Sequence, residues 1–132
     1  MCIRDSKGGV TLGKVVAGGA MMGPAVENLS YPTTKTTSGL IMLSAAAAEP
    51  PQVNPCIRCG RCVEYCPMGL EPVEVNQAYA ARDVQELGKL HVDYCFNCGS
   101  CSFVCPAKRP CTQMMGLAKA FYLGEIKKGG NK

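Results

Sequence analysis

The sequence of this 132-residue chain predicts a mainly α-helical fold that follows a short segment of strands and turns. Two stretches in the second half, residues 73–87 and 112–124, repeat apolar side chains at helical spacing. An alanine run followed by Glu49-Pro50-Pro51 separates this half from a turn-rich first half. We therefore expect a domain boundary at about Pro50.

The first six residues, Met1 to Ser6, do not fit the rest of the sequence. They resemble read-through of sequencing-adapter sequence, so we interpret residues 1–6 as a non-native leader and assign no ligand role to Cys2. On this interpretation the chain is a fragment whose natural N-terminal part is missing. Residues 7–49 are then the C-terminal remnant of a β-rich upstream domain together with its linker.

Within residues 7–49 we expect two short strands, one starting at Lys14–Ala17 and a buried one at Leu40–Leu43. Between them, residues 18–24 read Gly-Gly-Ala-Met-Met-Gly-Pro and predict a tight turn with two methionines packed beneath it. The stretch does not match the dinucleotide-binding pattern G-x-G-x-x-G, and Pro24 follows where a phosphate-binding helix should begin. Lys35 is expected to be solvated.

Eight of the ten cysteines fall in two runs of the same spacing, C-x2-C-x2-C-x3-C-P. The runs consist of Cys56, Cys59, Cys62 and Cys66 before Pro67, and of Cys95, Cys98, Cys101 and Cys105 before Pro106. This spacing is the known ligand pattern of bacterial iron–sulfur proteins. Three thiolates three residues apart can curl around one corner of a cubane, while the fourth is carried away toward another. We therefore expect an α-helical ferredoxin-like dicluster [4Fe–4S] domain over residues 50–125, with a polar tail at 126–132.

The spacing favours crossed ligation of two [4Fe–4S] clusters, with local ligation inside each run as the alternative. The crossed assignment gives one cluster the ligands Cys56, Cys59, Cys62 and Cys105, and the other the ligands Cys95, Cys98, Cys101 and Cys66. Gly60 and Gly99 precede the third ligand of each run, where a small residue lets backbone N–H groups approach sulfur. We expect an apolar coat around the clusters, formed by Ile57, Val63, Phe96 and Val104.

Two other interpretations of the cysteines fit less well. A disulfide scaffold spaces its cysteines irregularly, and a structural zinc site needs two pairs of ligands rather than a third cysteine and a following proline. The formal net charge of +4 is offset by two clusters of about −2 each, so we expect no nucleic-acid partner. Because no run approaches roughly 18–20 apolar residues, we expect no transmembrane span either.

The remaining elements follow from apolar spacing. We expect one helix from Val73 to about Leu87, ended by Gly88, in which Gln77 interrupts the apolar stripe. A last helix is expected to be capped by Thr112 and to end near Gly124. Since the spacer shows no strand alternation, a helical module fits better than a ferredoxin built from β-hairpins. Cys111 is expected to be a small buried hydrophobe rather than a ligand.

The chain resembles the C subunit of the Rnf ion-translocating electron-transport complex over roughly residues 13–123. Three segments carry the resemblance: Gly13 to Gly23, Pro32 to Ile41, and Pro55 to Pro72, completed by the second cysteine run from Tyr94 to Pro106. The cysteine runs alone are shared with other helical ferredoxin modules. The Gly-Gly-Ala-Met-Met-Gly loop and the Lys35 segment narrow the resemblance to this family.

The resemblance implies an electron-transfer subunit, peripheral on the cytoplasmic face of the cell membrane. Its partners would be the other Rnf subunits, with ferredoxin as redox partner, and FMN and NADH would bind only in the missing upstream part. We see no catalytic site in the chain itself. The alternatives are an iron–sulfur subunit of another respiratory oxidoreductase, such as heterodisulfide or fumarate reductase, an iron–sulfur sensor, and a structural zinc-binding interaction module.

Overall fold

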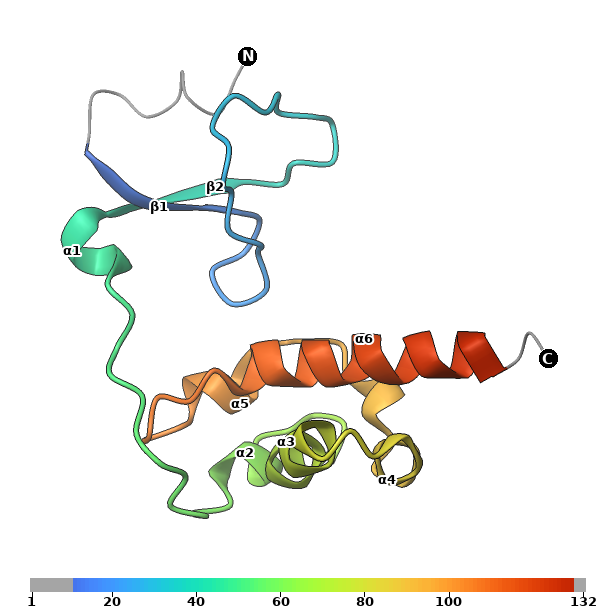
Figure 1. The fold of residues 1–132 in the computed structure, drawn as a ribbon. Coiled ribbons are helices and arrows are strands. Elements are labelled where there is room, and N and C mark those ends of the chain that lie inside the picture. Colours follow the sequence, from blue (N-terminus) through green and yellow to red (C-terminus); the bar gives the residue numbers. More distant parts are fainter. Residues whose placement is uncertain (1–10, 130–132) are drawn as a thin grey trace. The chain divides into compact units, whose positions relative to one another are not determined.

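The computed structural model describes residues 11–129, and it divides the chain into two compact units, residues 1–51 and 52–132. Figure 1 shows strands and a short helix in the first unit, and helices in the second. The six residues that we interpret as a non-native leader, and with them Cys2, lie outside the described part. The fold is thus rich in helix, with a small two-stranded sheet.

The first unit is built on an antiparallel pair, β1 (Leu12–Ala17) and β2 (Leu40–Ser44). Both expected strands are therefore present. Val15 is buried, whereas Leu40–Leu43 of β2 are half-buried rather than buried as predicted, since a two-stranded sheet alone buries little surface. The single turn α1 (Ala45–Ala48) follows directly, capped by the Ser44 hydroxyl.

The glycine-rich turn after β1 forms as expected, but its methionines do not pack beneath it. Gly23 N–H donates to the Gly19 carbonyl at 2.8 Å, and a Cβ at Gly23 would lie 2.6 Å from two carbonyl oxygens, so only glycine fits. Met21 and Met22 are 49% and 60% exposed. The two methionine side chains therefore lie on the surface of the turn rather than beneath it.

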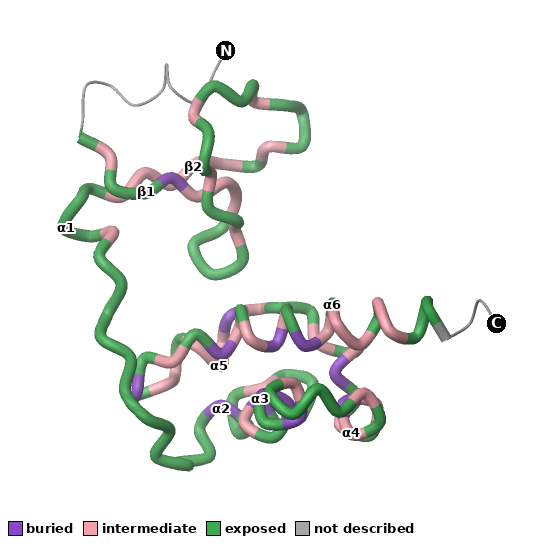
Figure 2. Tube along the Cα trace, viewed as in Figure 1, coloured by how far each residue is buried: buried purple, intermediate pink, exposed green. Residues whose placement is uncertain are grey.

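The second unit consists of short helices around one long helix (Figure 1). Its elements are α2 (Arg61–Glu64), α3 (Pro72–Ala80), α4 (Val84–Lys89), the 3-10 turn η2 (Val92–Tyr94), α5 (Ser100–Phe103) and α6 (Cys111–Gly129). Helix α6 contacts α3, α4, η2 and α5. The hydrophobic core lies between these elements, coloured as buried in Figure 2, and consists of Leu70, Val75, Ala78, Leu87, Val92, Met115 and Ala118.

The single helix predicted from Val73 to Leu87 is wrong, because the chain breaks after Ala80. Arg82 adopts a left-handed backbone conformation (φ 57°), and its guanidinium stacks on the rings of Tyr79 and Phe121 at 4.8 and 5.0 Å. Asp83 then begins α4 as its N-cap. Local capping and a stacking contact thus override the continuous helical spacing.

The last helix also departs from the prediction at both ends. It begins at Cys111 directly after Pro110, so Thr112 lies inside the first turn rather than at the cap. The helix passes through Gly124 and continues to Gly129, into the stretch from 126 that we predicted to be a tail. Ion pairing of Lys128 with Glu125 at 2.7 Å supports this final turn.

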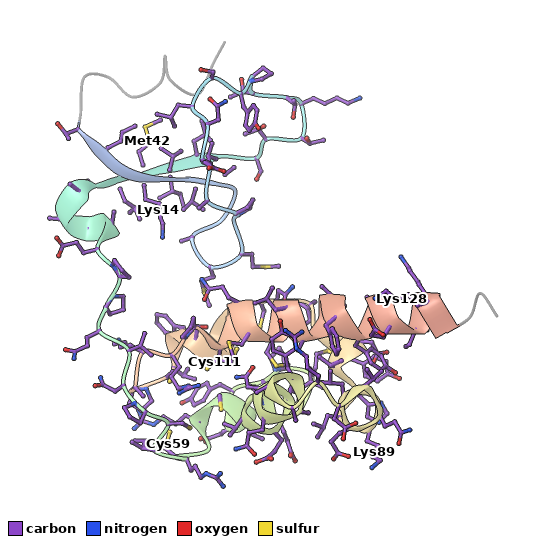
Figure 3. All side chains as sticks on the ribbon, in the orientation of Figure 1. Lys14, Met42, Cys59, Lys89, Cys111 and Lys128 are labelled. Carbon is purple, nitrogen blue, oxygen red and sulfur yellow. The ribbon has the colours of Figure 1, made fainter. Side chains whose placement is uncertain are left out.

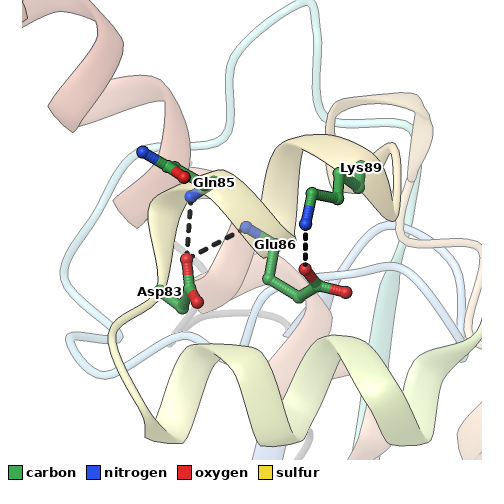
Figure 4. Close-up of polar contacts among 4 residues, drawn as sticks. All are labelled: Asp83, Gln85, Glu86 and Lys89. Atoms are coloured by element: carbon green, nitrogen blue, oxygen red, sulfur yellow. Dashed lines mark hydrogen bonds and ion pairs between the residues drawn. The ribbon is translucent and has the colours of Figure 1, made fainter.

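Replacing Asp83 with alanine is expected to destabilise the second unit by about 1 kcal/mol. The Asp83 carboxylate accepts hydrogen bonds from the backbone N–H groups of Gln85 and Glu86, both at 3.0 Å (Figure 4). Chemical denaturation of the fully assembled protein measures the loss. Asp83→Asn is the matched control, because asparagine caps about as well as aspartate. Equal destabilisation by both substitutions would contradict the capping role.

Candidate metal centre

The two cysteine runs adopt the same backbone conformation. In the first, Arg58 and Gly60 have positive φ values of 52° and 77°, and α2 follows at once. In the second, Asn97 and Gly99 have φ values of 56° and 90°, followed by α5. Left-handed residues at these positions reverse the chain between successive cysteines. Each run therefore curls as a cluster-binding loop requires.

The repeat continues beyond each fourth cysteine. The Cys66 carbonyl accepts a hydrogen bond from Gly69 N–H at 3.0 Å, and the Cys105 carbonyl accepts one from Lys108 N–H at 3.2 Å. Gly69 and Lys108 both have positive φ, at 64° and 53°. After these turns the chain enters α3 and α6, so each run is followed by a helix that packs in the same core.

A cavity of about 400 Å³ lies at the first run. Three cysteines of that run and one of the second line it: Cys56, Cys59, Cys62 and Cys105. Cys56 and Cys59 are exposed, whereas Cys62 is buried. Figure 3 labels Cys59 on the loop before α2 and Cys111, another lining residue, at the start of α6. The cavity thus brings together one of the two predicted ligand sets.

A second, much smaller cavity of about 20 Å³ is lined by the other predicted set, Cys66, Cys95, Cys98 and Cys101. All four cysteines are half-buried. Their donor chemistry suits an iron–sulfur cluster, since thiolates are its usual ligands. At this volume, the walls must move apart to admit one.

Among residues 11–129, no group of three His, Cys, Asp or Glu side chains converges closely enough to bind a single metal ion. The cysteines of a cubane attach to four different iron atoms, so they need not converge on one point. The four predicted cysteine ligands around each cavity therefore suit a cluster rather than a single metal ion.

Burial raises the pKa of the Cys62 thiol, and the nearby Cys101 and Cys56 raise it further when charged. Burial also raises the pKa of Cys101, an effect that its hydrogen bond with Thr112 opposes. Iron binds the thiolate form, so cluster assembly must release these protons. Low pH therefore opposes assembly.

Cys111 lies between the two sets. Burial raises its pKa to about 12, with further contributions from Cys105 and Cys62 of one set and Cys101 of the other. Only 5% of the residue is exposed, and it begins α6 as predicted for a small buried hydrophobe. At neutral pH Cys111 is a protonated thiol.

The expected apolar coat forms only in part. Val104 is half-buried, and Ile57 lines the first cavity although it is 68% exposed. Val63 and Phe96 are 37% and 50% exposed and line neither cavity. Polar contacts to the cysteines were not predicted from the sequence. The Cys66 sulfur accepts a hydrogen bond from Leu70 N–H at 3.3 Å, and the Cys101 sulfur lies 3.5 Å from the Thr112 hydroxyl oxygen.

Helix α3 supplies residues to the lining of the first cavity that were not predicted from the sequence. Val73, Gln77 and Ala80 line the first cavity, which explains why a polar residue interrupts that stripe. Asn76 lines it as well, and although the residue is buried, its Oδ1 has no hydrogen-bond partner in the described structure. In the sequence, the adjacent polar residues Asn76 and Gln77, which interrupt the apolar stripe, could have indicated these contacts.

Known proteins match the same part of the chain. Residues 55–108 match the family model described as a 4Fe-4S dicluster domain. The chain is 42% identical over 77 residues to the C subunit of the ion-translocating oxidoreductase complex of Rhodobacter capsulatus, a match that covers 58% of this chain and 15% of that protein. Over 59 residues it is 44% identical to the C subunit of the proton-translocating ferredoxin:NAD(+) oxidoreductase complex of Clostridium ljungdahlii, covering 45% and 13%.

A third relative is the C subunit of the Na(+)-translocating ferredoxin:NAD(+) oxidoreductase complex of Acetobacterium woodii, 38% identical over 72 residues, with 54% of this chain and 16% of that protein covered. The chain therefore spans less than a fifth of the length of each of these three relatives.

No helix of residues 11–129 is both long enough and apolar enough to span a membrane. Residues 55–108 are thus similar to a 4Fe-4S dicluster domain, and the predicted resemblance to the C subunits of ion-translocating oxidoreductase complexes is confirmed over the C-terminal region of the chain.

Proposed function

We propose that the chain passes electrons through two [4Fe–4S] clusters as a peripheral subunit, on the cytoplasmic face of the membrane, of an ion-translocating NADH/ferredoxin oxidoreductase of the Rnf type. The observation that carries the proposal is the pair of cavities, each lined by three cysteines of one run and the fourth of the other. The clusters would supply one-electron redox chemistry. The chain's own residues hold and orient them.

The assignment of four cysteines to each cluster supports this role. Cys56, Cys59, Cys62 and Cys105 would bind one cluster, and Cys95, Cys98, Cys101 and Cys66 the other. Each set takes a ligand from both runs, and Cys62 of the first set is near enough to Cys101 of the second for the charge of one thiolate to affect the other. Closely spaced sites are what electron transfer from one cluster to the next requires.

Exposed apolar side chains around the runs suit contact with other subunits. Ile57, Tyr65, Phe96 and Phe103 are each at least 50% exposed and all lie within the two cysteine runs. Burial of such side chains is a common source of association free energy. The partners that we propose are the other subunits of the complex, with ferredoxin as redox partner. FMN and NADH would act outside these residues.

The proposal is tested on protein purified or reconstituted without oxygen. We expect about eight iron and eight sulfide per chain, with a broad visible absorption band that bleaches with dithionite. Metal analysis and absorption spectroscopy measure both. Stoichiometric zinc without visible colour would refute the proposal and favour a structural zinc module instead.

A further inference from the structure

The internal repeat allows the two cavities to be compared position by position. The offset that relates Cys56 to Cys95 also relates Gly60 to Gly99 and the first residue of α3 to the first residue of α6. The backbone conformations of the two cysteine loops agree, including the left-handed pair Arg58 and Asn97. Besides their volumes, the two cavities differ in the side chains that line them.

The first difference is charge. Arg58, Arg61 and Arg109 line the first cavity. Their counterparts in the other half are uncharged: Asn97, Ser100 and Leu70. Within the described chain, neither cavity is lined by an aspartate or glutamate that would cancel the guanidinium charges. Positive charge stabilises the reduced form of a cluster, because reduction makes the cluster more negative.

Arg58 is held against the first cavity. With the Gln77 amide turned to suit its neighbours, its oxygen accepts a hydrogen bond from Arg58 Nη2 at 3.2 Å, and its nitrogen donates to Glu74 Oε2 at 3.2 Å. Arg109 is half-buried, so its charge is less screened by water than that of a fully exposed side chain.

The second difference is a hydrogen-bond donor. Asn76 lines the first cavity, and its counterpart in the repeat is the apolar Met115, which lines the second. Asn76 is buried, and its Oδ1, a hydrogen-bond acceptor, has no partner in the described structure. A cluster offers sulfur acceptors, which the unpaired oxygen cannot satisfy, but the Nδ2 group of the same amide can donate to them. Such hydrogen bonds raise the reduction potential.

Solvent access also favours a higher reduction potential at the first site, whereas one cation near the second cavity favours the second site. Cys56 and Cys59 are exposed, whereas the four cysteines of the second cavity are half-buried, and water stabilises the more negative reduced state. Near the second cavity, Lys119 Nζ donates to the Cys95 carbonyl at 2.6 Å. This single ammonium does not line the cavity, so it does not balance three guanidinium groups that line the other.

We propose that the two sites are electrostatically unequal, and that the cluster held by Cys56, Cys59, Cys62 and Cys105 has the higher reduction potential. This inference rests on the proposed electron-transfer function. The first electron from a low-potential one-electron donor then resides on that cluster, whose core charge falls from 2+ to 1+, and no bond forms or breaks. The second electron goes to the cluster of Cys66, Cys95, Cys98 and Cys101.

The test is an equilibrium titration of the reconstituted chain with dithionite, followed by electron paramagnetic resonance. We expect two one-electron steps that differ at least tenfold in equilibrium constant, about 59 mV. Cys59→Ser and Cys98→Ser assign the signals: whether the cluster is altered or lost, the signal that changes identifies its site. Cys59→Ser should change the signal that appears first.

Charge-neutralising variants test the cause. Arg109→Gln should make the first step roughly tenfold less favourable and leave the second unchanged, while Arg109→Lys should restore it. Lys119→Gln should lower the reduction potential of the second step alone. Ser100→Arg, which introduces the counterpart of Arg61, should raise the reduction potential of the second step. Lys89→Gln is the matched control, since Lys89 is exposed, pairs with Glu86 and lines neither cavity.

Two outcomes would overturn the inference. One is a change of the first-appearing signal by Cys98→Ser. The other is an equal shift of both steps by Arg109→Gln and Lys89→Gln, which would show an effect of net charge alone. A chain that takes up no iron and sulfide would instead overturn the proposed function, so the two failures are distinguishable.

Discussion

Replacing Cys105 with alanine is expected to remove the cluster that Cys56 binds, although Cys105 lies in the other run. Cys105 lines the first cavity with Cys56, Cys59 and Cys62, and the second cavity is lined without it. The Cys105→Ala and Cys56→Ala variants should both retain about four iron per chain and the same residual resonance signal. Iron analysis together with the spectrum of the dithionite-reduced protein measures this.

Two variants at the second cavity provide the reciprocal test of crossed ligation. Cys66→Ala and Cys95→Ala should leave the other signal, since both residues line the second cavity. Cys111→Ala is the matched control, because it removes a buried thiol beside the first cavity that is not a predicted ligand, and all of the roughly eight iron atoms should remain. If Cys105→Ala gave the spectrum of Cys95→Ala, ligation would be local and the crossed assignment wrong.

The sequence carried most of the information about the site. Regular spacing and a proline after each fourth cysteine were enough to select eight residues from ten, and the structure arranges these eight around two cavities in the crossed sets. Their assignment as ligands stays a prediction until the cysteine variants are examined. The exposure of Ile57 and Phe96 could not be predicted, because apolar character alone does not say whether a loop residue faces a cluster or a partner.

Helix boundaries were less predictable for local reasons. The apolar spacing runs on from Val73 to Leu87, but Asp83 forms a cap and Arg82 adopts a left-handed conformation to reach two aromatic rings, one of them on α6. A contact with a residue so distant in the sequence is invisible to a periodicity argument. Gly88 belongs to the same contact region, since a Cβ there would lie 3.0 Å from the Tyr122 hydroxyl. Its role is close packing rather than ending a helix.

Removing the clusters with a chelator is expected to lower the melting temperature of the second unit by more than about 20 °C. Its core lies between α3, α4, η2 and α6, whereas residues 52–59 and 95–98 are in neither helix nor strand. Metal binding in such sites contributes directly to folding free energy, about 10–16 kcal/mol for structural zinc. A loss of even about 5 kcal/mol corresponds to roughly 20 °C in a domain of this size.

The loss of stability should differ between segments of the chain, so hydrogen exchange, which resolves individual amides, is more informative than the melting temperature. Amides of α2 and α5 should lose protection first, because these single turns depend on hydrogen bonds to the carbonyls of Gly60 and Gly99 within the cysteine loops. Amides around Leu87 and Met115 should stay protected longer, since both side chains are almost fully buried in the core. Unchanged protection of α2 and α5 after complete removal of iron would mean that the loops are formed by the chain alone, and that the clusters occupy a site already folded to receive them.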